Sequence, residues 1–230
     1  MIQQKPLDPA INPPPNEDKP LLRGWFHAIT AVLAVILTVV LCWRTRSDGP
    51  RLLSMLIFGL SMIEMYTLSA IYHIGRWEPV TKRVLRSVDH ANIFVLIAGT
   101  YTPICFNVLS GNLRISILSL IWILALLGIG VAIFFLKLPR YVTAGLYVAM
   151  GWVVVLALPA LLAVLPWQMV GTLLLGGLLY TIGAVVYGLR WPDPFPRVLG
   201  FHEIFHLFVI AGSFAFVAAV WIWVVPFPRV

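Results

Sequence analysis

The chain has 230 residues, of which 60% are hydrophobic and only 11% are charged, and its mean hydropathy is +0.94. One aqueous core cannot hide so many apolar residues, which excludes a soluble globular protein and predicts an integral membrane protein. The formal net charge of +7 is spread over the connections between apolar segments, without the basic stripe that follows a phosphate backbone, so we expect no nucleic-acid partner.

The first 24 residues differ in composition from the rest of the chain. They are polar and rich in proline, with three consecutive prolines at 13–15, and they lack the apolar residues needed to pack on a folded domain. We therefore expect residues 1–24 to form a disordered tail and residues 25–230 to form one membrane domain. A cleaved signal peptide is not expected, because the apolar run from Trp25 is long enough to span and has no small-residue cleavage site.

Seven apolar stretches follow the tail, each near the roughly 20 residues that cross a hydrocarbon core of about 30 Å. Their residues do not alternate between polar and apolar, which argues against the strands of a membrane β-barrel. The sequence therefore predicts an all-α integral membrane protein with seven transmembrane helices. The stretches cover residues 25–43, 52–73, 89–109, 114–136, 141–164, 167–189 and 200–225.

The basic residues predict how these helices are oriented. Eleven of the sixteen Lys and Arg residues fall in the tail or in the connections that share its side of the membrane. Because short cytoplasmic connections carry the excess of positive charge, we expect a cytoplasmic N-terminus and an outside C-terminus.

Several polar residues fall at the predicted cytoplasmic end of the helices. The seventh stretch begins with FHEIFH, in which His202 and His206 lie one helical turn apart on the same face. His73 ends the second stretch, and Asp89 begins the third. Three imidazoles at one depth can hold a metal ion such as zinc, and the Asp89 carboxylate could orient a metal-bound water and accept its proton. Ser69, one turn deeper than His73, could contact the metal's surroundings or a developing oxyanion.

Each of these polar residues also has a purely structural explanation. A single histidine at a helix end is usually a packing residue of the interface, and we interpret His27 and His90 in this way. Asp89 could complement the start of a helix dipole, and the Ser69 hydroxyl could bond to a carbonyl of its own helix. The common depth of the three histidines, the aspartate and the serine favours a shared site over unrelated roles.

Two glutamates need separate interpretations. Glu64 lies in the middle of the second stretch, on the face opposite His73, and we expect it to be protonated or hydrogen-bonded to a neighbouring helix. Glu203 completes a literal HExxH motif, which permits an intramembrane metalloprotease with Glu203 as general base. Because no acidic residue follows Glu203 to complete such a site, the protease is the third of the functions considered.

Three blocks of the sequence resemble the signatures of a known family. EMYTLSAIYH at Glu64–His73, DHANIFVLIAGTYTP at Asp89–Pro103 and HEIFH at His202–His206 are similar to the blocks of the hemolysin III family. This family is the bacterial branch of the progestin and adipoQ receptor superfamily, which also resembles the alkaline ceramidases. The resemblance implies a seven-helix protein of the bacterial inner membrane with a cytoplasmic N-terminus.

The resemblance also implies the composition of the site. Zinc would be bound by His73, His202 and His206, with a water near Asp89 and with Ser69 close to the metal. His90 and Glu203 lie inside the blocks, but the family's zinc site does not require them, so their roles stay open.

The activity is not settled by the resemblance, and whether the chain is an enzyme stays open. A ceramidase-like hydrolase would cleave a lipid-like amide, with zinc polarising the carbonyl while Asp89 deprotonates the metal-bound water that attacks it. Its partners would be membrane lipids, including an acyl-amide substrate that enters sideways through a cavity opened by kinks at Pro103 or Pro159. The alternative is a non-enzymatic zinc-containing sensor or regulator of membrane homeostasis. The substrate and the oligomeric state are not predicted.

Overall fold

The computed structural model describes residues 19–135 and 138–228, so residues 1–18 of the expected tail lie outside the described part. The described chain is helical and contains seven segments that are long and apolar enough to cross a membrane, as predicted. The side of the membrane that each end faces stays a prediction. The helices are α1 (Trp25–Thr45), α2 (Gly49–Ile74), α3 (Pro79–Val108), α4 (Gly111–Phe134), α5 (Arg140–Gly151), α6 (Leu158–Val164), α7 (Trp167–Leu189) and α8 (Phe201–Ala219), which continues as a π-helical turn (Val220–Val224).

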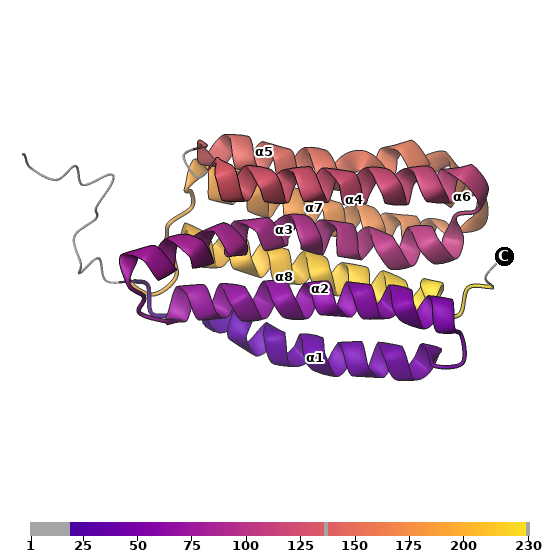
Figure 1. Ribbon diagram of the computed structural model, residues 1–230, viewed down its shortest axis with the longest axis horizontal. Coiled ribbons are helices and arrows are strands. Elements are labelled where there is room, and N and C mark those ends of the chain that lie inside the picture. The colour runs from indigo at the N-terminus through magenta and orange to yellow at the C-terminus, as the bar shows by residue number, and fades with distance from the viewer. Residues whose placement is uncertain (1–18, 136–137, 229–230) are drawn as a thin grey trace, which may run out of the picture.

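The helices form an elongated bundle in which α3 is central. In Figure 1, α1 and α2 lie along the lower side, α4 and α5 lie along the upper side, and α3 runs between them. The most apolar window of α3 is 83% buried, against 22% to 50% for the other spans. Packing inside the protein explains how α3 can carry Asp89, Asn92 and Asn107 at membrane depth, because these groups avoid contact with lipid.

Helix α3 begins earlier than hydropathy predicts. It starts at Pro79 instead of residue 89, with the proline in the first turn, where a missing N–H costs nothing. Its first two turns are mostly exposed and carry Lys82, Arg83 and Arg86. Since lysine and arginine are good helix formers, the helix continues beyond the apolar segment. Asp89 therefore lies inside the helix, which removes the explanation of this residue as a helix-start charge.

The fifth span is interrupted near its middle. A 3₁₀ segment (Trp152–Ala157) separates α5 from α6, and Pro159 lies in the first turn of α6. The Tyr101 hydroxyl from α3 bonds to backbone groups at this interruption: it donates to the Gly151 carbonyl at 2.6 Å and accepts from the Val154 N–H at 2.7 Å. An irregular backbone at this depth is tolerated because a neighbouring helix satisfies its polar groups. Pro103, by contrast, lies within a continuous α3.

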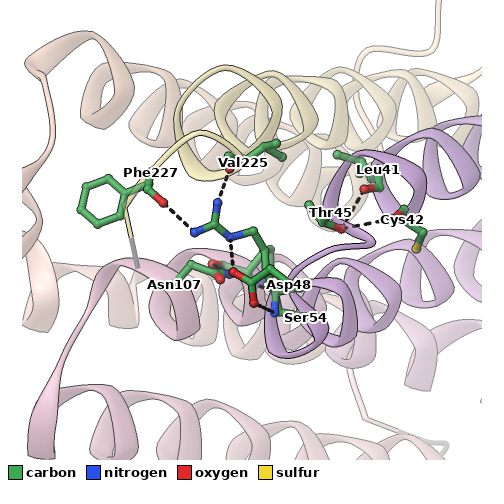
Figure 2. A network of polar contacts seen from close by, with 10 residues as sticks. Leu41, Cys42, Thr45, Asp48, Ser54, Asn107, Val225 and Phe227 are labelled. Atoms are coloured by element: carbon green, nitrogen blue, oxygen red, sulfur yellow. Dashed lines mark hydrogen bonds and ion pairs between the residues drawn. The ribbon is translucent and has the colours of Figure 1, made fainter. Parts of the chain in front are cut away.

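A second set of polar contacts joins α2 to the C-terminal end of α8. Figure 2 shows the carbonyls of Val225 and Phe227 facing one guanidinium, that of Arg51 near the start of α2. The bond from Arg51 to the Phe227 carbonyl measures 2.6 Å. In the same region Asn107 of α3 donates to Ser54 of α2 at 2.9 Å. Arg51 thus satisfies carbonyls that a helix C-terminus leaves without partners.

Candidate metal centre

The structure brings the three predicted histidines together. His73 is in the last turn of α2, and His202 and His206 are in the first two turns of α8. One ligand nitrogen from each ring lies within 4.8 Å of the other two, and the Nε2 atoms of His73 and His202 are 3.1 Å apart. Segments separated by 129 residues therefore present their imidazoles to one small volume. Binding of a metal by these residues stays a prediction.

The donor set fits a metal ion. Imidazole nitrogens are common zinc ligands, and three of them with one further open position are typical of a zinc site that does chemistry. His206 is only 2% exposed, and its Nδ1 atom has no hydrogen-bond partner among the described residues. An unpartnered polar atom in a buried place costs free energy, which a bound cation or its ligands would recover.

Asp89 lies beside His73, and Ser69 lies one turn before His73 on the same helix; the roles of both stay predictions. The Asp89 Oδ2 atom is 3.7 Å from the His73 Nε2 atom, which is too long for a hydrogen bond, and Oδ1 has no partner in the described chain. Ser69 is fully buried, and its hydroxyl does not bond to a carbonyl of its own helix. Both side chains therefore keep free hydrogen-bonding capacity beside the cluster.

His27 belongs to this cluster, although the sequence interpretation made it an interface residue. Its ring is fully buried and is stacked on His206, with ring centroids 3.7 Å apart and an interplanar angle of 12°. Neither of its ring nitrogens has a hydrogen-bond partner within the described residues. The missed signal was depth: His27 lies in the first turn of α1, at the end of the bundle where α2 ends and α8 begins.

Glu203 is engaged away from the histidines. Its carboxylate is fully buried, forms an ion pair with Arg23 and accepts the Gly200 N–H at 2.8 Å. It therefore caps the N-terminus of α8, where a negative charge complements the helix dipole. This position explains the acidic residue of the HExxH motif without a role as general base.

Residues 19–24, here called the strap, were expected to belong to a disordered tail but make defined contacts. The Lys19 ammonium donates to the carbonyls of His73 and Gly75, at 3.1 and 2.9 Å, at the C-terminus of α2. The Leu21 N–H donates to the Arg197 carbonyl at 2.9 Å, ahead of α8. The strap therefore connects the ends of the two helices that carry the histidines. Burial first, and then the charges of Lys82, Arg23 and Arg76, lower the pKa of Lys19.

Gly24 ends the strap in direct contact with the site. Its φ of +85° lies in the left-handed region, which glycine adopts without strain. A Cβ atom at this position would lie 2.9 Å from the Cβ atom of His73 and from a side-chain carbon of Ile74. The close approach of the strap to α2 therefore requires glycine.

Glu64 does not make the expected bond to a neighbouring helix. Its side chain is exposed on α2, and within the described chain it has no hydrogen-bond or ion-pair partner. Glu64 lies on the face of α2 opposite His73, as predicted, but that face points away from the bundle. Glu64 therefore takes no part in the histidine cluster.

An apolar cavity opens near the cluster, between α3, α5, α7 and α8. Its volume is about 610 Å³, including its open mouth; Phe205 on its wall directly precedes His206 in the sequence, but none of the three histidines lines it. The interrupted fifth span contributes Gly151 and Trp152 to the wall, whereas neither Pro103 nor Pro159 is among the lining residues, so the expected opening of a cavity by proline kinks stays a prediction. Its lining is mostly apolar with a few polar groups, as in sites for small molecules or lipids.

Sequence comparisons match the chain to a family profile and to named relatives. A family profile described as "Haemolysin-III related" matches residues 16–217. The chain is 36% identical over 191 residues to "Hemolysin-3 homolog" of Bacillus subtilis (strain 168), covering 82% of this chain and 86% of that protein. It is 33% identical over 205 residues to "Hemolysin-3" of Bacillus cereus, covering 87% and 89%. It is also 26% identical over 204 residues to "Monocyte to macrophage differentiation factor" of Homo sapiens, covering 85% and 80%.

Proposed function

This chain belongs to the hemolysin III family, within the progestin and adipoQ receptor superfamily, and we propose that it is a zinc-dependent hydrolase of lipid-like amides. One observation carries the proposal: three clustered histidines lie beside a carboxylate that is close to them but not bonded to them. The Asp89 Oδ2 atom is 3.7 Å from the nearest imidazole nitrogen, while its Oδ1 atom has no partner in the described residues. A structural zinc site is normally closed by four protein ligands, whereas three ligands leave a position for chemistry.

The residues of the chain have distinct tasks in this proposal. His73, His202 and His206 would hold the zinc, which when bound supplies Lewis acidity toward the amide carbonyl and toward water. Asp89 accepts the proton that the attacking water gives up, and passes it to the leaving nitrogen when the amide bond breaks. The buried Ser69 hydroxyl donates to the oxygen on which negative charge develops. The products are a fatty acid and an amine.

The apolar cavity supports a lipid substrate. Its walls carry Tyr101, Trp152, Tyr180 and Phe216, and it lies against the part of α8 that follows His206. An acyl chain in this cavity would be shielded from water while its amide group points to the histidines. Because the acyl chain is itself a membrane component, the substrate enters sideways from the lipid.

A non-enzymatic sensor or membrane-homeostasis regulator is the second candidate. The strap favours it, because Lys19 and Arg23 tie the ends of α2 and α8 together beside the cluster. In such a protein the metal would be structural, and Asp89 would have no proton to transfer. The protease is the weakest candidate, since Glu203 is occupied as a helix cap.

The hydrolase and the non-enzymatic regulator can be distinguished by measuring zinc content and fatty-acid release in one set of variants. The purified wild type should carry about one zinc per chain by mass spectrometry of the metal, since a single three-histidine cluster is present among the described residues. His73→Ala and His202→Ala should lose most of it. Asp89→Asn should keep the zinc but release at least ~100-fold less fatty acid from a ceramide-like lipid, as expected for loss of a general base.

Glu64→Gln is the matched control for the carboxylate-to-amide change, because Glu64 is exposed and distant from the cluster. It should retain both zinc and fatty-acid release. If the wild type releases no product from a broad panel of acyl-amide lipids, the proposed hydrolase activity is wrong, but zinc binding is not contradicted. If both histidine variants keep the zinc content of the wild type, the proposed zinc site is wrong.

A further inference from the structure

A second hollow opens at the same end of the bundle as the histidine cluster, but on the other side of α7. It lies between the beginning of α3, the end of α4, the beginning of α5 and the end of α7. Its volume is about 390 Å³, including the part that is open to the outside. Its polar wall consists of Arg86, His90, Arg140, Thr143 and Tyr187.

The two arginines of this hollow carry positive charge that nothing in the described chain neutralises. Neither guanidinium has an ion-pair or hydrogen-bond partner among residues 19–135 and 138–228. Arg140 is half-buried and lies over the ring of Tyr187, with 5.6 Å between its Cζ atom and the ring centroid. This cation–π contact orients the guanidinium without using its N–H donors.

His90 and Tyr187 form a fixed wall behind the arginines. His90 Nδ1 lies 2.8 Å from the Arg86 carbonyl, which can only accept, so Nδ1 is the donor. His90 Nε2 therefore accepts from the Tyr187 hydroxyl, at 3.1 Å. The donors of His90 and Tyr187 are thus satisfied within the protein, whereas the guanidiniums of Arg86 and Arg140 and the Thr143 hydroxyl have no hydrogen-bond partner among the described residues. Two guanidiniums that line one hollow suit the oxygens of a phosphate.

The border of the hollow is apolar and faces outward. Val131 and Ala132 of α4 line it together with Phe135, which follows the helix; Phe135 is exposed, as are the neighbouring Ile133 and Phe134. A soluble ion makes no use of such a border, whereas the acyl chains of a lipid would pack against it. Basic pockets between transmembrane helices bind anionic head groups in this way.

We propose that this hollow binds a phosphate-type oxyanion carried by the head group of a membrane lipid, held by Arg86 and Arg140. The site is distinct from the apolar cavity and does not depend on zinc or on hydrolysis. Tyr187 lies between the hollow and the histidine cluster: its ring borders the hollow, and its ring centroid is 6.0 Å from that of His202. An anionic lipid bound here would rest against the outer wall of the histidine cluster.

Binding can be measured by native mass spectrometry of the full chain in non-ionic detergent. Dioleoyl phosphatidylglycerol is the probe; diacylglycerol tests the lipid without phosphate, and inorganic phosphate tests the ion without lipid. We expect phosphatidylglycerol to bind at least ~10-fold more tightly than diacylglycerol, with Arg86→Gln and Arg140→Gln each weakening it about 10-fold through loss of a charge-assisted contact. Arg86→Lys and Arg140→Lys, which keep the charge, should lose less.

Arg44→Gln is the matched control, because Arg44 also lies over an aromatic ring, that of Trp221, but at the other end of the bundle. It should bind phosphatidylglycerol like the wild type. Equal binding by wild type and Arg86→Gln, an equal loss in Arg44→Gln, or diacylglycerol binding as tight as that of phosphatidylglycerol would overturn the proposal. Displacement of the lipid by inorganic phosphate at equal concentration would show a site for a soluble ion and would also overturn it. Arg86 is exposed, so its variants remain decisive if a change at Arg140 impairs folding.

Discussion

At the scale of the residue, the histidines that meet at this end of the bundle come from α1, α2 and α8, and Asp89 of α3 lies next to them. The HExxH motif pointed to Glu203, which the structure uses to cap α8. Depth pointed to His73, which lies with the α8 histidines, and to Asp89, which lies 3.7 Å from His73. His27 met the same criterion, but a single histidine at a helix end was interpreted as a packing residue of the interface. Its burial depends on the packing of α1 against α8, a long-range contact that a single sequence does not display.

The stacking of His27 on His206 predicts a role in orienting a ligand. His27→Ala should weaken zinc binding by about 10–100-fold, as is typical when a residue that orients a metal ligand is removed. His27→Phe should stay within a few-fold of wild type, because a planar ring still covers His206. Chelator competition with the purified protein measures both affinities. Equal zinc affinity of the alanine variant and the wild type would mean that the stacking has no effect on the site.

At the scale of the element, hydropathy located every span, but it did not predict the early start of α3 or the position of the break in the fifth span. The exposed first turns of α3 carry charges that a hydropathy pattern assigns to a loop, although these residues are favourable in a helix. The break in the fifth span follows from Pro159 only in part, since the 3₁₀ segment begins at Trp152. It is stabilised by the Tyr101 hydroxyl of another helix, and such a partner is not evident from the local sequence.

The strap gives a prediction at this scale, because it meets α2 at Gly24. Gly24→Ala should displace the backbone around His73 and lower zinc affinity by about 10-fold, since the new Cβ atom would overlap His73 and would be strained at φ +85°. Gly49→Ala, at a glycine with no atom within 4 Å of a new Cβ, is the control and should bind zinc normally. Isothermal titration of metal-free protein with zinc compares the two. Normal affinity of Gly24→Ala would mean that the strap does not position His73.

At the scale of the whole molecule, the seven-helix architecture was predictable because each span must satisfy its backbone internally and cover itself with apolar side chains. Which helices pack against one another could not be predicted in the same way. The central place of α3 and the outward direction of Glu64 depend on how the helices associate, and every helix of the seven is apolar enough to face lipid. The orientation of the bundle stays a prediction, which rests on the distribution of charge and on the family resemblance.

Orientation can be checked with a membrane-impermeant maleimide on single-cysteine variants that lack Cys42 and Cys105. Positive charge on the cytoplasmic side predicts that Ser47→Cys, between α1 and α2, is labelled in intact spheroplasts. Thr81→Cys, at the exposed beginning of α3, should be labelled only after lysis. The reverse pattern would place the histidine cluster at the outer face and would invert the predicted topology.

The distance along the chain between the two halves of the histidine cluster has a consequence for biosynthesis. His73 leaves the ribosome 129 residues before His202, and Arg23 precedes its partner Glu203 by 180 residues. Domains emerge from the ribosome N-terminus first, so α1 and α2 are inserted while α8 is still being synthesised. The three-histidine cluster cannot exist until the last helix is inserted. If the cluster binds the proposed metal, loading would therefore follow translation and would be confined to fully inserted chains.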